Sequence, residues 1–271
     1  MTGKTVLITG ATGGIGLEAA RELARKGALV LIGARDAARG EAVVSEIAGA
    51  GGQAEFLRID MASSRSIREA AAGLAASHPK LDVLVNNAGV VTKKREVNAD
   101  GHEVIWATNF LGPLLLTRLL LPQLLAAPRP RVVNVSSMAH AYGRINWQDL
   151  ELTKGWRGIR AYANSKLALV LFTKDLARRE PRIAANAVHP GAIATGIWRA
   201  APQPFRFVLD LFLPSPKKGA QPVVRLAAAP EVEAVSGRYF DREREIAPAP
   251  AALNDADGAR LWELTKAGLA T

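Results

Sequence analysis

TVLITGATGGIG, residues 5–16, sets the architecture of this chain. It opens with a short apolar run rich in β-branched residues, typical of a buried strand, and a glycine-rich turn follows without a break. A helical pattern with Leu17, Ala20, Leu23 and Ala24 on its apolar face begins directly after the turn. In this order of strand, turn and helix, glycines allow close approach of the backbone to a pyrophosphate, which the free amides and the helix dipole attract. The stretch therefore predicts a dinucleotide-binding site.

The spacing of the glycines narrows the choice of ligand. Gly10, Gly14 and Gly16 follow Gly-x-x-x-Gly-x-Gly, and no Gly-Lys-Ser or Gly-Lys-Thr ends the turn, which disfavours a P-loop nucleotidase. A flexible structural turn is the alternative, and the flanking strand and helix argue against it. The residues predicted to contact the cofactor here are Gly10, Thr12, Gly13, Gly14, Ile15 and Gly16.

Outward from this turn, short Val-, Ile- and Leu-rich runs alternate with longer helical patterns, the signature of βαβ units. The predicted strands are Thr5–Ile8, Leu29–Ala34, Ala54–Ile59, Asp82–Asn86, Arg131–Val135, Ile183–Val188 and Gly237–Phe240. No linker or repeat divides the chain, so residues 1–271 are expected to form one domain. The predicted fold is an α/β Rossmann fold: a doubly wound, parallel, seven-stranded sheet of order 3-2-1-4-5-6-7 with helices on both faces.

Composition excludes several classes of protein. The chain of 271 residues is 49% hydrophobic and has no cysteine, which argues against disorder and excludes disulfides, thiolate catalysis and cysteine zinc sites. The first strand begins too close to Met1 for a signal peptide, and prolines and polar residues interrupt the Leu-rich stretch 111–127. We therefore expect a cytoplasmic protein without a transmembrane span.

The chain is basic, with 35 Lys and Arg against 25 Asp and Glu and a net charge of +10. These residues are scattered, with no long basic run and no aromatic-interleaved stripe, so a solvated surface is favoured over nucleic-acid binding. Such a surface can attract an anionic cofactor or make transient contact with an anionic membrane.

The end of the second strand, Ala34-Arg35-Asp36, bears on cofactor choice. Ala34 occupies the position where NAD enzymes place an acid for the ribose 2′-hydroxyl, and the Arg35 guanidinium suits a 2′-phosphate, which favours NADP(H). NAD(H) stays possible if Asp36 faces the ribose, although Asp36 also reads as a helix cap. Asp60-Met61 ends the third strand, where the carboxylate either accepts from the adenine amino group or caps the next helix.

Tyr162 and Lys166 lie four residues apart in a helical pattern and so share one face of the helix. An unperturbed tyrosine titrates near ~10, and an adjacent ammonium stabilises the phenolate. We therefore expect Lys166 to lower the pKa of Tyr162 and to make it an acid or base near neutral pH.

Five motifs occur in one order: Gly10/Gly14/Gly16, Asn86-Asn87-Ala88-Gly89, Ser136-Ser137, Tyr162-x-x-x-Lys166 and Pro190-Gly191. Together they resemble the short-chain dehydrogenase/reductases along essentially the whole chain. The resemblance implies Tyr162 as general acid/base, Ser137 as hydrogen-bond donor to the substrate oxygen, Lys166 as tuner of Tyr162 and ligand of the nicotinamide ribose, and Asn109 as holder of a water in the proton path. It also implies a cofactor site formed by Asn87, Ala88, Gly89, Tyr162, Lys166, Pro190, Gly191, Ile193 and Thr195.

Within that family, the segments around Ser137, Tyr162, His189 and Tyr239 look most like the retinol dehydrogenase and WW-domain oxidoreductase branch. The segment between Ser137 and Tyr162 is long, and in that branch such a segment borders the substrate pocket. Its apolar residues are Tyr142, Ile145, Trp147, Leu150, Trp156 and Ile159. A lipophilic carbonyl or alcohol is the substrate that this implies.

Residues 198–216 are apolar, aromatic and bracketed by prolines, and we interpret them as a substrate lid, with a packed core helix or a self-association surface as alternatives. The apolar helices Phe110–Leu125 and Ser165–Arg178 are compatible with a homodimer or homotetramer. His140 and His189 have no carboxylate partner or HxxxH spacing, so no metal is expected.

The predicted reaction is reversible hydride transfer between a nicotinamide and a carbonyl, with Tyr162 protonating the oxygen during reduction. A catalytically idle NADP-binding sensor or scaffold is the main alternative. The intact set of Ser137, Tyr162 and Lys166 argues against it.

Overall fold

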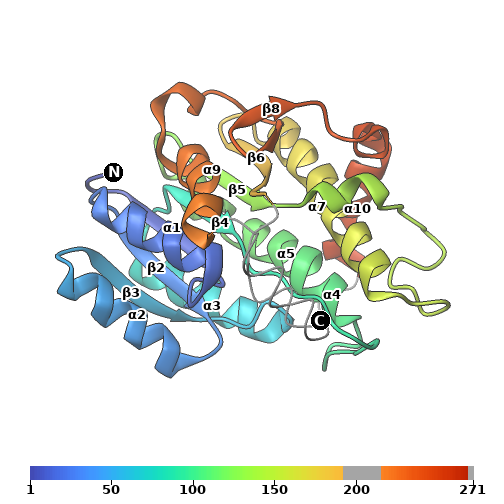
Figure 1. Ribbon diagram of the computed structural model, residues 1–271, viewed down its shortest axis with the longest axis horizontal. Coiled ribbons are helices and arrows are strands. Elements are labelled where there is room, and N and C mark those ends of the chain that lie inside the picture. The colour runs from blue at the N-terminus through green and yellow to red at the C-terminus, as the bar shows by residue number, and fades with distance from the viewer. Residues whose placement is uncertain (192–214, 268–271) are drawn as a thin grey trace.

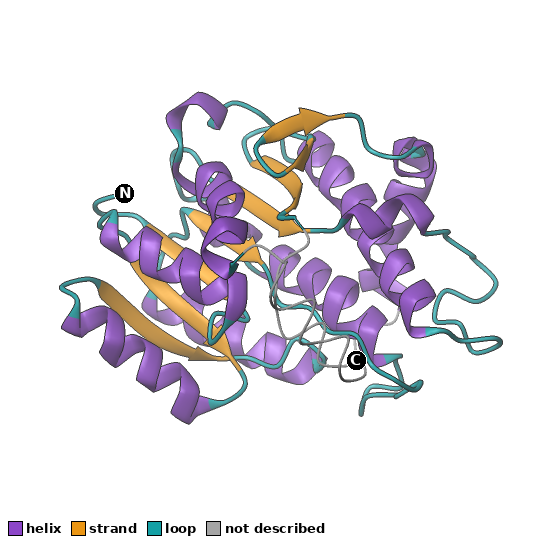
Figure 2. Cartoon of the chain, in the orientation of Figure 1, coloured by secondary structure: helices purple, strands orange, loops and turns teal. Residues whose placement is uncertain are grey.

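An eight-stranded sheet forms the centre of the molecule in the computed structural model, which describes residues 1–191 and 215–267 (Figures 1 and 2). Its order is β3-β2-β1-β4-β5-β6-β7-β8. The strands are β1 (Thr5–Thr9), β2 (Leu29–Ala34), β3 (Gln53–Arg58), β4 (Val83–Asn86), β5 (Arg131–Val135), β6 (Ala184–His189), β7 (Tyr239–Asp241) and β8 (Arg244–Ile246). The doubly wound fold and the order of its first seven strands are therefore confirmed.

The predicted number of strands was wrong by one. β8 pairs antiparallel with β7 through a tight turn in which Arg242 has a φ of 55°. This turn contains no glycine or asparagine, the residues that usually mark a hairpin in a sequence, and all three residues of β8 are exposed. An edge strand this short and polar has no apolar alternation to predict it from.

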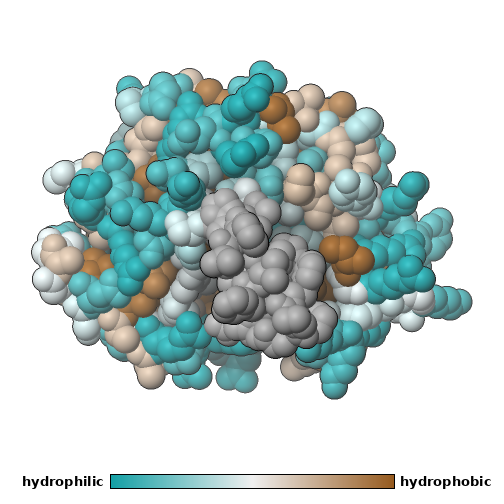
Figure 3. Space-filling model, viewed as in Figure 1, coloured by the Kyte–Doolittle hydropathy of each residue, from teal (hydrophilic) through white to brown (hydrophobic). Residues whose placement is uncertain are grey.

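Helices cover both faces of the sheet (Figure 2). The α-helices are α1 (Gly14–Arg25), α2 (Ala37–Gly49), α3 (Ser64–Ser77), α4 (Val104–Trp106), α5 (Gly112–Leu119), α6 (Leu121–Leu125), α7 (Gly158–Arg179), α9 (Pro216–Ala228) and α10 (Asp255–Ala267). A π-helix, η1 (Ala107–Leu111), joins α4 to α5, and short 3-10 helices are η2 (Met138–Tyr142), η4 (Pro230–Val232) and η5 (Pro250–Leu253). Hydrophilic side chains lie over α1 and α9 on the face shown in Figure 3.

The alternation of side chains along the strands divides the core into two layers. Val6 and Ile8 of β1 pack with buried residues of α1, α2 and α9, whereas Leu7 between them packs with α3, α5 and α7. All five residues of β1 are buried, as expected for a central parallel strand. Burial on both faces fixes the strand register, because a slip by one residue would exchange the two layers.

Register also sets the position of the site. β1 pairs with β2 on one side and β4 on the other, so the chain reverses its winding direction next to the glycine turn. The carboxyl ends of the parallel strands β1, β4, β5 and β6 lie at one edge of the sheet. Ligands of doubly wound sheets bind at this edge, at the point where the strand order reverses.

Within the part of the chain that the structure describes, no helix combines the length and apolar composition needed to cross a membrane. Most of the predicted lid, 198–214 of 198–216, lies outside the described residues, and its last two residues lead into α9.

Candidate active site

The glycine turn is shaped to receive a phosphate. Gly10 and Gly14 have φ values of 68° and 57°, a region that favours glycine, and α1 begins at Gly14 without a side-chain cap from Gly13. The first-turn amides of α1 are therefore free of a side-chain acceptor and can bind an anion. A Cβ on Gly16 would lie 2.5 Å from Gly10 O, so this glycine allows α1 to pack against the turn. These features fit the dinucleotide that the sequence predicts.

The loop after β4 holds the turn in place. Thr9 Oγ1 accepts hydrogen bonds from the amides of Asn87 and Ala88, both at 3.1 Å. Asn87 Nδ2 in turn donates to Thr9 O at 2.9 Å and lies 3.3 Å from Gly10 O. Asn87 was predicted to bind the cofactor; the structure places its side-chain amide on the glycine turn, which makes it a support for that turn.

The adenosine end of the site lies at the start of α2. Asp36 caps this helix, with Oδ1 accepting from Arg39 N at 3.1 Å, which is the alternative role that its position in the sequence allowed. Arg35 is exposed, and Arg39 reaches back over the turn, where its Nη2 donates to Thr12 O at 3.0 Å. A Cβ on Gly13 would lie 3.5 Å from the same nitrogen. Sequence reasoning missed Arg39, although a second arginine one helical turn beyond Arg35 was the available signal.

Asp60 and Met61 follow β3. Asp60 Oδ1 accepts from Ala62 N at 2.9 Å, which closes a local turn, while Ser63 is the residue that caps α3. Asp60 is therefore not the helix cap that the sequence offered as an alternative. The Met61 side chain is buried in the core, where its Cε lies 3.1 Å from the position of a Cβ on Gly112.

Ser137 and Tyr162 are brought together by β5 and α7. Ser137 caps η2, its Oγ accepts from Ala139 N at 3.2 Å, and it lies near enough to the Tyr162 hydroxyl to act on the pKa of that group. The neighbouring Ser136 is buried and its Oγ donates to Lys166 O at 3.1 Å. Of the two serines, Ser137 is thus the one next to the tyrosine.

Lys166 lies one turn along α7 from Tyr162. Its Nζ is 5.6 Å from the centre of the tyrosine ring and donates to Val135 O at 2.8 Å. Burial lowers the pKa of Lys166 from 10.5 to about 8. Within residues 1–191 and 215–267 no carboxylate pairs with Lys166, so the ammonium is desolvated without an opposing charge from that part of the chain.

The structure disagrees with the expected effect of Lys166 on Tyr162. Burial raises the pKa of Tyr162, and the nearby Ser137 opposes this only in part. The physical reason is that tyrosine and lysine share one poorly solvated pocket, where each charged form is disfavoured. In the chain without cofactor, Tyr162 is therefore a neutral hydroxyl, the form that can donate a proton.

Asn109 lies in the π-helix η1, a distortion that often marks a functional position. Its Oδ1 accepts from Val90 N at 2.8 Å, and its Nδ2 donates to Val90 O and to Ser165 Oγ. The side chain therefore stabilises the helix distortion and the loop after Gly89. Holding a water in the proton path stays a prediction.

The remaining predicted residues divide between described and undescribed parts. Gly191 has a φ of 99° and follows the buried Pro190, whereas Ile193 and Thr195 lie outside the described residues. In the long segment before Tyr162, Ile145, Trp147 and Leu150 pack against the main core, while Tyr142 and Ile159 are exposed.

His140 and His189 are both buried, and burial lowers the pKa of each. His140 Nδ1 lies 2.8 Å from Ser137 O, and its Nε2 accepts from Ala249 N at 3.1 Å. His140 thus links the backbone at Ser137 to the C-terminal segment. Among residues 1–191 and 215–267 there is no group of three metal-ligating side chains, and a metal-free site stays a prediction.

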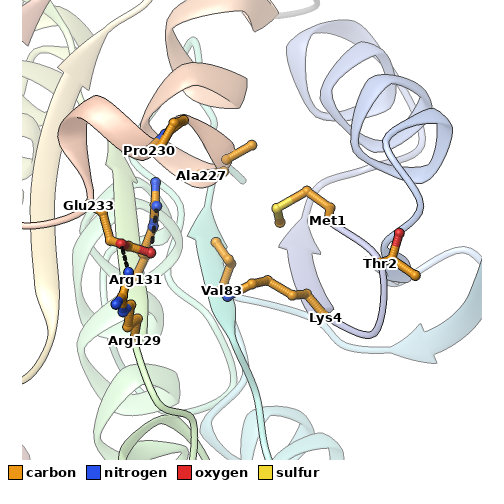
Figure 4. Close-up of a pocket in the computed structure, with 10 residues that line it drawn as sticks. Met1, Thr2, Lys4, Val83, Arg129, Arg131, Ala227, Pro230 and Glu233 are labelled. Atoms are coloured by element: carbon orange, nitrogen blue, oxygen red, sulfur yellow. Dashed lines mark hydrogen bonds and ion pairs between the residues drawn. The ribbon is translucent and has the colours of Figure 1, made fainter.

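A cavity of about 200 Å³ lies at the opposite edge of the sheet, near Met1 (Figure 4). Its arginines already have partners: Arg129 and Arg131 both contact Glu233, and Arg131 Nη1 also donates to Ala229 O at 2.8 Å. Arg131 is the first residue of β5, and Ser137 lies beyond the other end of that strand. The cavity is therefore separate from the tyrosine site.

Comparison with known proteins agrees with this geometry. The model of the short-chain dehydrogenase family matches residues 4–204. Mouse retinol dehydrogenase 14 is 40% identical over 98% of this chain and 86% of its own length, and human retinol dehydrogenase 13 is 40% identical over 96% and 82%.

Solved structures agree as well. A Mycobacterium paratuberculosis protein superposes with a TM-score of 0.81 at 34% identity over 100% of this chain and 94% of its own. A protein described as an NAD(P)-dependent gluconate 5-dehydrogenase from Beutenbergia cavernae, with NADP bound, has a TM-score of 0.74 at 30% identity over 90% and 96%. The chain belongs to the short-chain dehydrogenase family, on its retinol dehydrogenase branch, and is an oxidoreductase of alcohol and carbonyl groups.

Proposed function

We propose that this chain is an NADP(H)-dependent oxidoreductase of lipophilic aldehydes, ketones or alcohols. The observation that carries the proposal is the meeting of Ser137, Tyr162 and Lys166 at the sheet edge that also carries the glycine turn. A bound nicotinamide supplies hydride chemistry at its C4 atom. Its pyrophosphate would be held by the turn from Gly10 to Gly16, and its ribose by Lys166.

The protein residues handle charge and protons. In the reducing direction, negative charge develops on the carbonyl oxygen, and the hydroxyls of Ser137 and Tyr162 are the donors that stabilise it. Tyr162 then gives up its proton to that oxygen. A raised pKa keeps Tyr162 protonated before the reaction, and the nearby Lys166 stabilises the phenolate that forms.

Three features support NADP(H) over NAD(H). Arg35 is exposed at the end of β2, and Arg39 places a second guanidinium over Thr12 and Gly13. Asp36, the residue that would favour NAD(H), uses its carboxylate to cap α2. Two guanidinium groups near the adenosine end suit a 2′-phosphate in charge and in geometry.

The surroundings of the site support a lipophilic substrate. Three large apolar side chains next to the serine and tyrosine are exposed: Met138 is 60% exposed, Tyr142 80% and Ile159 70%. Met138 follows Ser137 directly, and Ile159 lies one helical turn before Tyr162. Exposed apolar groups beside polar reacting groups are typical of a site for an apolar ligand. The retinol dehydrogenases, by name, act on such a molecule.

The test is a titration of the purified chain with NADPH and NADH, followed by nicotinamide fluorescence, and then turnover of a panel of lipophilic aldehydes and ketones. We expect tighter binding of NADPH and turnover of at least one carbonyl. Tyr162→Phe should lose turnover and keep NADPH binding. NADPH binding without turnover of any carbonyl would favour the idle sensor.

A further inference from the structure

The segment 143–157, called the insert below, is attached to a helix near each of its ends. Trp147 Nε1 donates to Asp257 Oδ1 of α10 at 2.7 Å, and Trp156 Nε1 donates to Glu103 Oε1 at 3.2 Å. Glu103 caps α4 and therefore belongs to a different part of the fold. Two tryptophans of the insert are thus hydrogen-bonded to other parts of the fold, Trp147 to α10 and Trp156 to the residue that caps α4.

Glu103 is unusual because its carboxylate is buried, with 0% of the residue exposed. Its Oε2 accepts from Trp106 N at 2.8 Å, and its Oε1 faces the indole of Trp156. Burial raises the pKa of Glu103, and its hydrogen bonds, including the one from Trp156, act in the opposite direction. Burying a carboxylate costs free energy unless its oxygens are hydrogen-bonded. Loss of the hydrogen bond from the Trp156 indole N–H would therefore be unfavourable.

The same indole packs on the apolar cluster that the tyrosine also contacts. Trp156 and Tyr162 both contact a small apolar cluster of Ile105, Leu152 and Ala161, which is separate from the main core. Ala161 directly precedes Tyr162, and α7 begins two residues after Trp156. A shift of the indole would therefore move the cluster against which the tyrosine rests.

The backbone around the cluster has one rare conformation and one very close contact. Leu152 has a φ of 51°, in the left-handed region that leucine rarely adopts, and is 2% exposed. A Cβ on Gly158 would lie 2.7 Å from Thr92 O, so the start of α7 is packed tightly on the loop after β4. Rare backbone conformations persist where the surrounding contacts fix them.

We propose that Glu103 and Trp156 are positioning residues for Tyr162: their hydrogen bond holds the end of the insert at the start of α4 and so keeps the tyrosine side chain in place next to Ser137. The effect on catalysis rests on the proposed function, in which Tyr162 donates the proton. The effect on the surroundings of Tyr162 does not depend on the proposed function.

The test compares Trp156→Phe with Trp147→Phe, each of which removes one indole N–H from the same insert and keeps an aromatic ring. Nitration of each tyrosine by tetranitromethane, measured by peptide mass spectrometry, reports accessibility without turnover. Tyr142, which is 80% exposed, and Tyr239, which is 3% exposed, serve as internal references. We expect Trp156→Phe to raise the nitration rate of Tyr162 relative to Tyr142 at least fivefold, and Trp147→Phe to leave it unchanged.

Kinetics with NADPH and a carbonyl give the second measurement. Trp156→Phe should lower kcat about tenfold and shift the alkaline limb of the pH profile of kcat/KM, while the Kd for NADPH stays unchanged. Trp147→Phe should leave kcat, this pH profile and the Kd for NADPH unchanged. If Trp156→Phe does not fold, Glu103→Gln takes its place, since it leaves one of the two N–H groups without an acceptor. Equal nitration of Tyr162 in the two tryptophan variants would overturn the proposal. Raised nitration in a protein that reduces no carbonyl would leave the positioning role in place and overturn the proposed function.

Discussion

Replacing Lys166 by methionine should stabilise the cofactor-free protein at neutral pH, and the gain should disappear in alkali. Burial lowers the pKa of Lys166 from 10.5 to about 8, so the unfolded chain binds more protons than the folded chain between these values. Folding around the charged lysine therefore costs free energy below pH 8, and this cost falls as the pH rises toward 10.5. Linkage over this interval gives a cost of about 3 kcal/mol at pH 7 and about 1 kcal/mol at pH 9.5.

Methionine also removes the hydrogen bond from Nζ to Val135 O, which is worth about 1 kcal/mol at either pH. The expected net gain in the free energy of unfolding is therefore about 2 kcal/mol at pH 7 and close to zero at pH 9.5. Urea unfolding followed by tryptophan fluorescence at both pH values measures it, and Lys154→Met, at an exposed lysine, controls for the loss of one positive charge. The same gain at pH 7 and pH 9.5 would refute the lowered pKa of Lys166.

Four further substitutions test the cofactor site. Arg35→Ala and Arg39→Ala should each weaken NADPH binding about 10- to 100-fold, as expected for loss of a charge-assisted hydrogen bond, and leave NADH binding unchanged; equal effects on both cofactors would contradict a 2′-phosphate site. Asp36→Ala should lower the free energy of unfolding by about 1 kcal/mol through loss of the α2 cap, with an unchanged ratio of NADPH to NADH affinity, whereas a changed ratio would assign Asp36 to the ribose. Gly16→Ala should cost about 1–3 kcal/mol of stability and abolish cofactor binding, because its Cβ would lie 2.5 Å from Gly10 O; wild-type binding would show that the turn is not closely packed.

The fold and the centre of the site were predictable because they depend on local patterns. Apolar runs, the glycine turn and the spacing of Tyr162 and Lys166 each specify an element, and parallel strands bring their carboxyl ends to one edge. Ser137 and Tyr162 meet there although 24 residues separate them, as the family resemblance implied.

The features that sequence reasoning missed depend on contacts between distant segments. Glu103 reads as an ordinary exposed acid, since nothing near it in the sequence reveals that Trp156 completes its hydrogen bonds. Arg39 reaches Thr12 only once α2 has packed on β2 and beside α1. The raised pKa of Tyr162 depends on how deeply α7 is buried, and helical spacing alone gives no measure of burial.

The most direct test of the central claim is transfer of deuterium from NADPH that carries deuterium in both C4 positions to a lipophilic carbonyl, with the alcohol analysed by mass spectrometry. The wild-type chain should yield alcohol with one deuterium on the former carbonyl carbon, and Tyr162→Phe should bind NADPH and yield almost none. Unlabelled alcohol, or equal labelling by the two proteins, would contradict hydride transfer with Tyr162 as the proton donor.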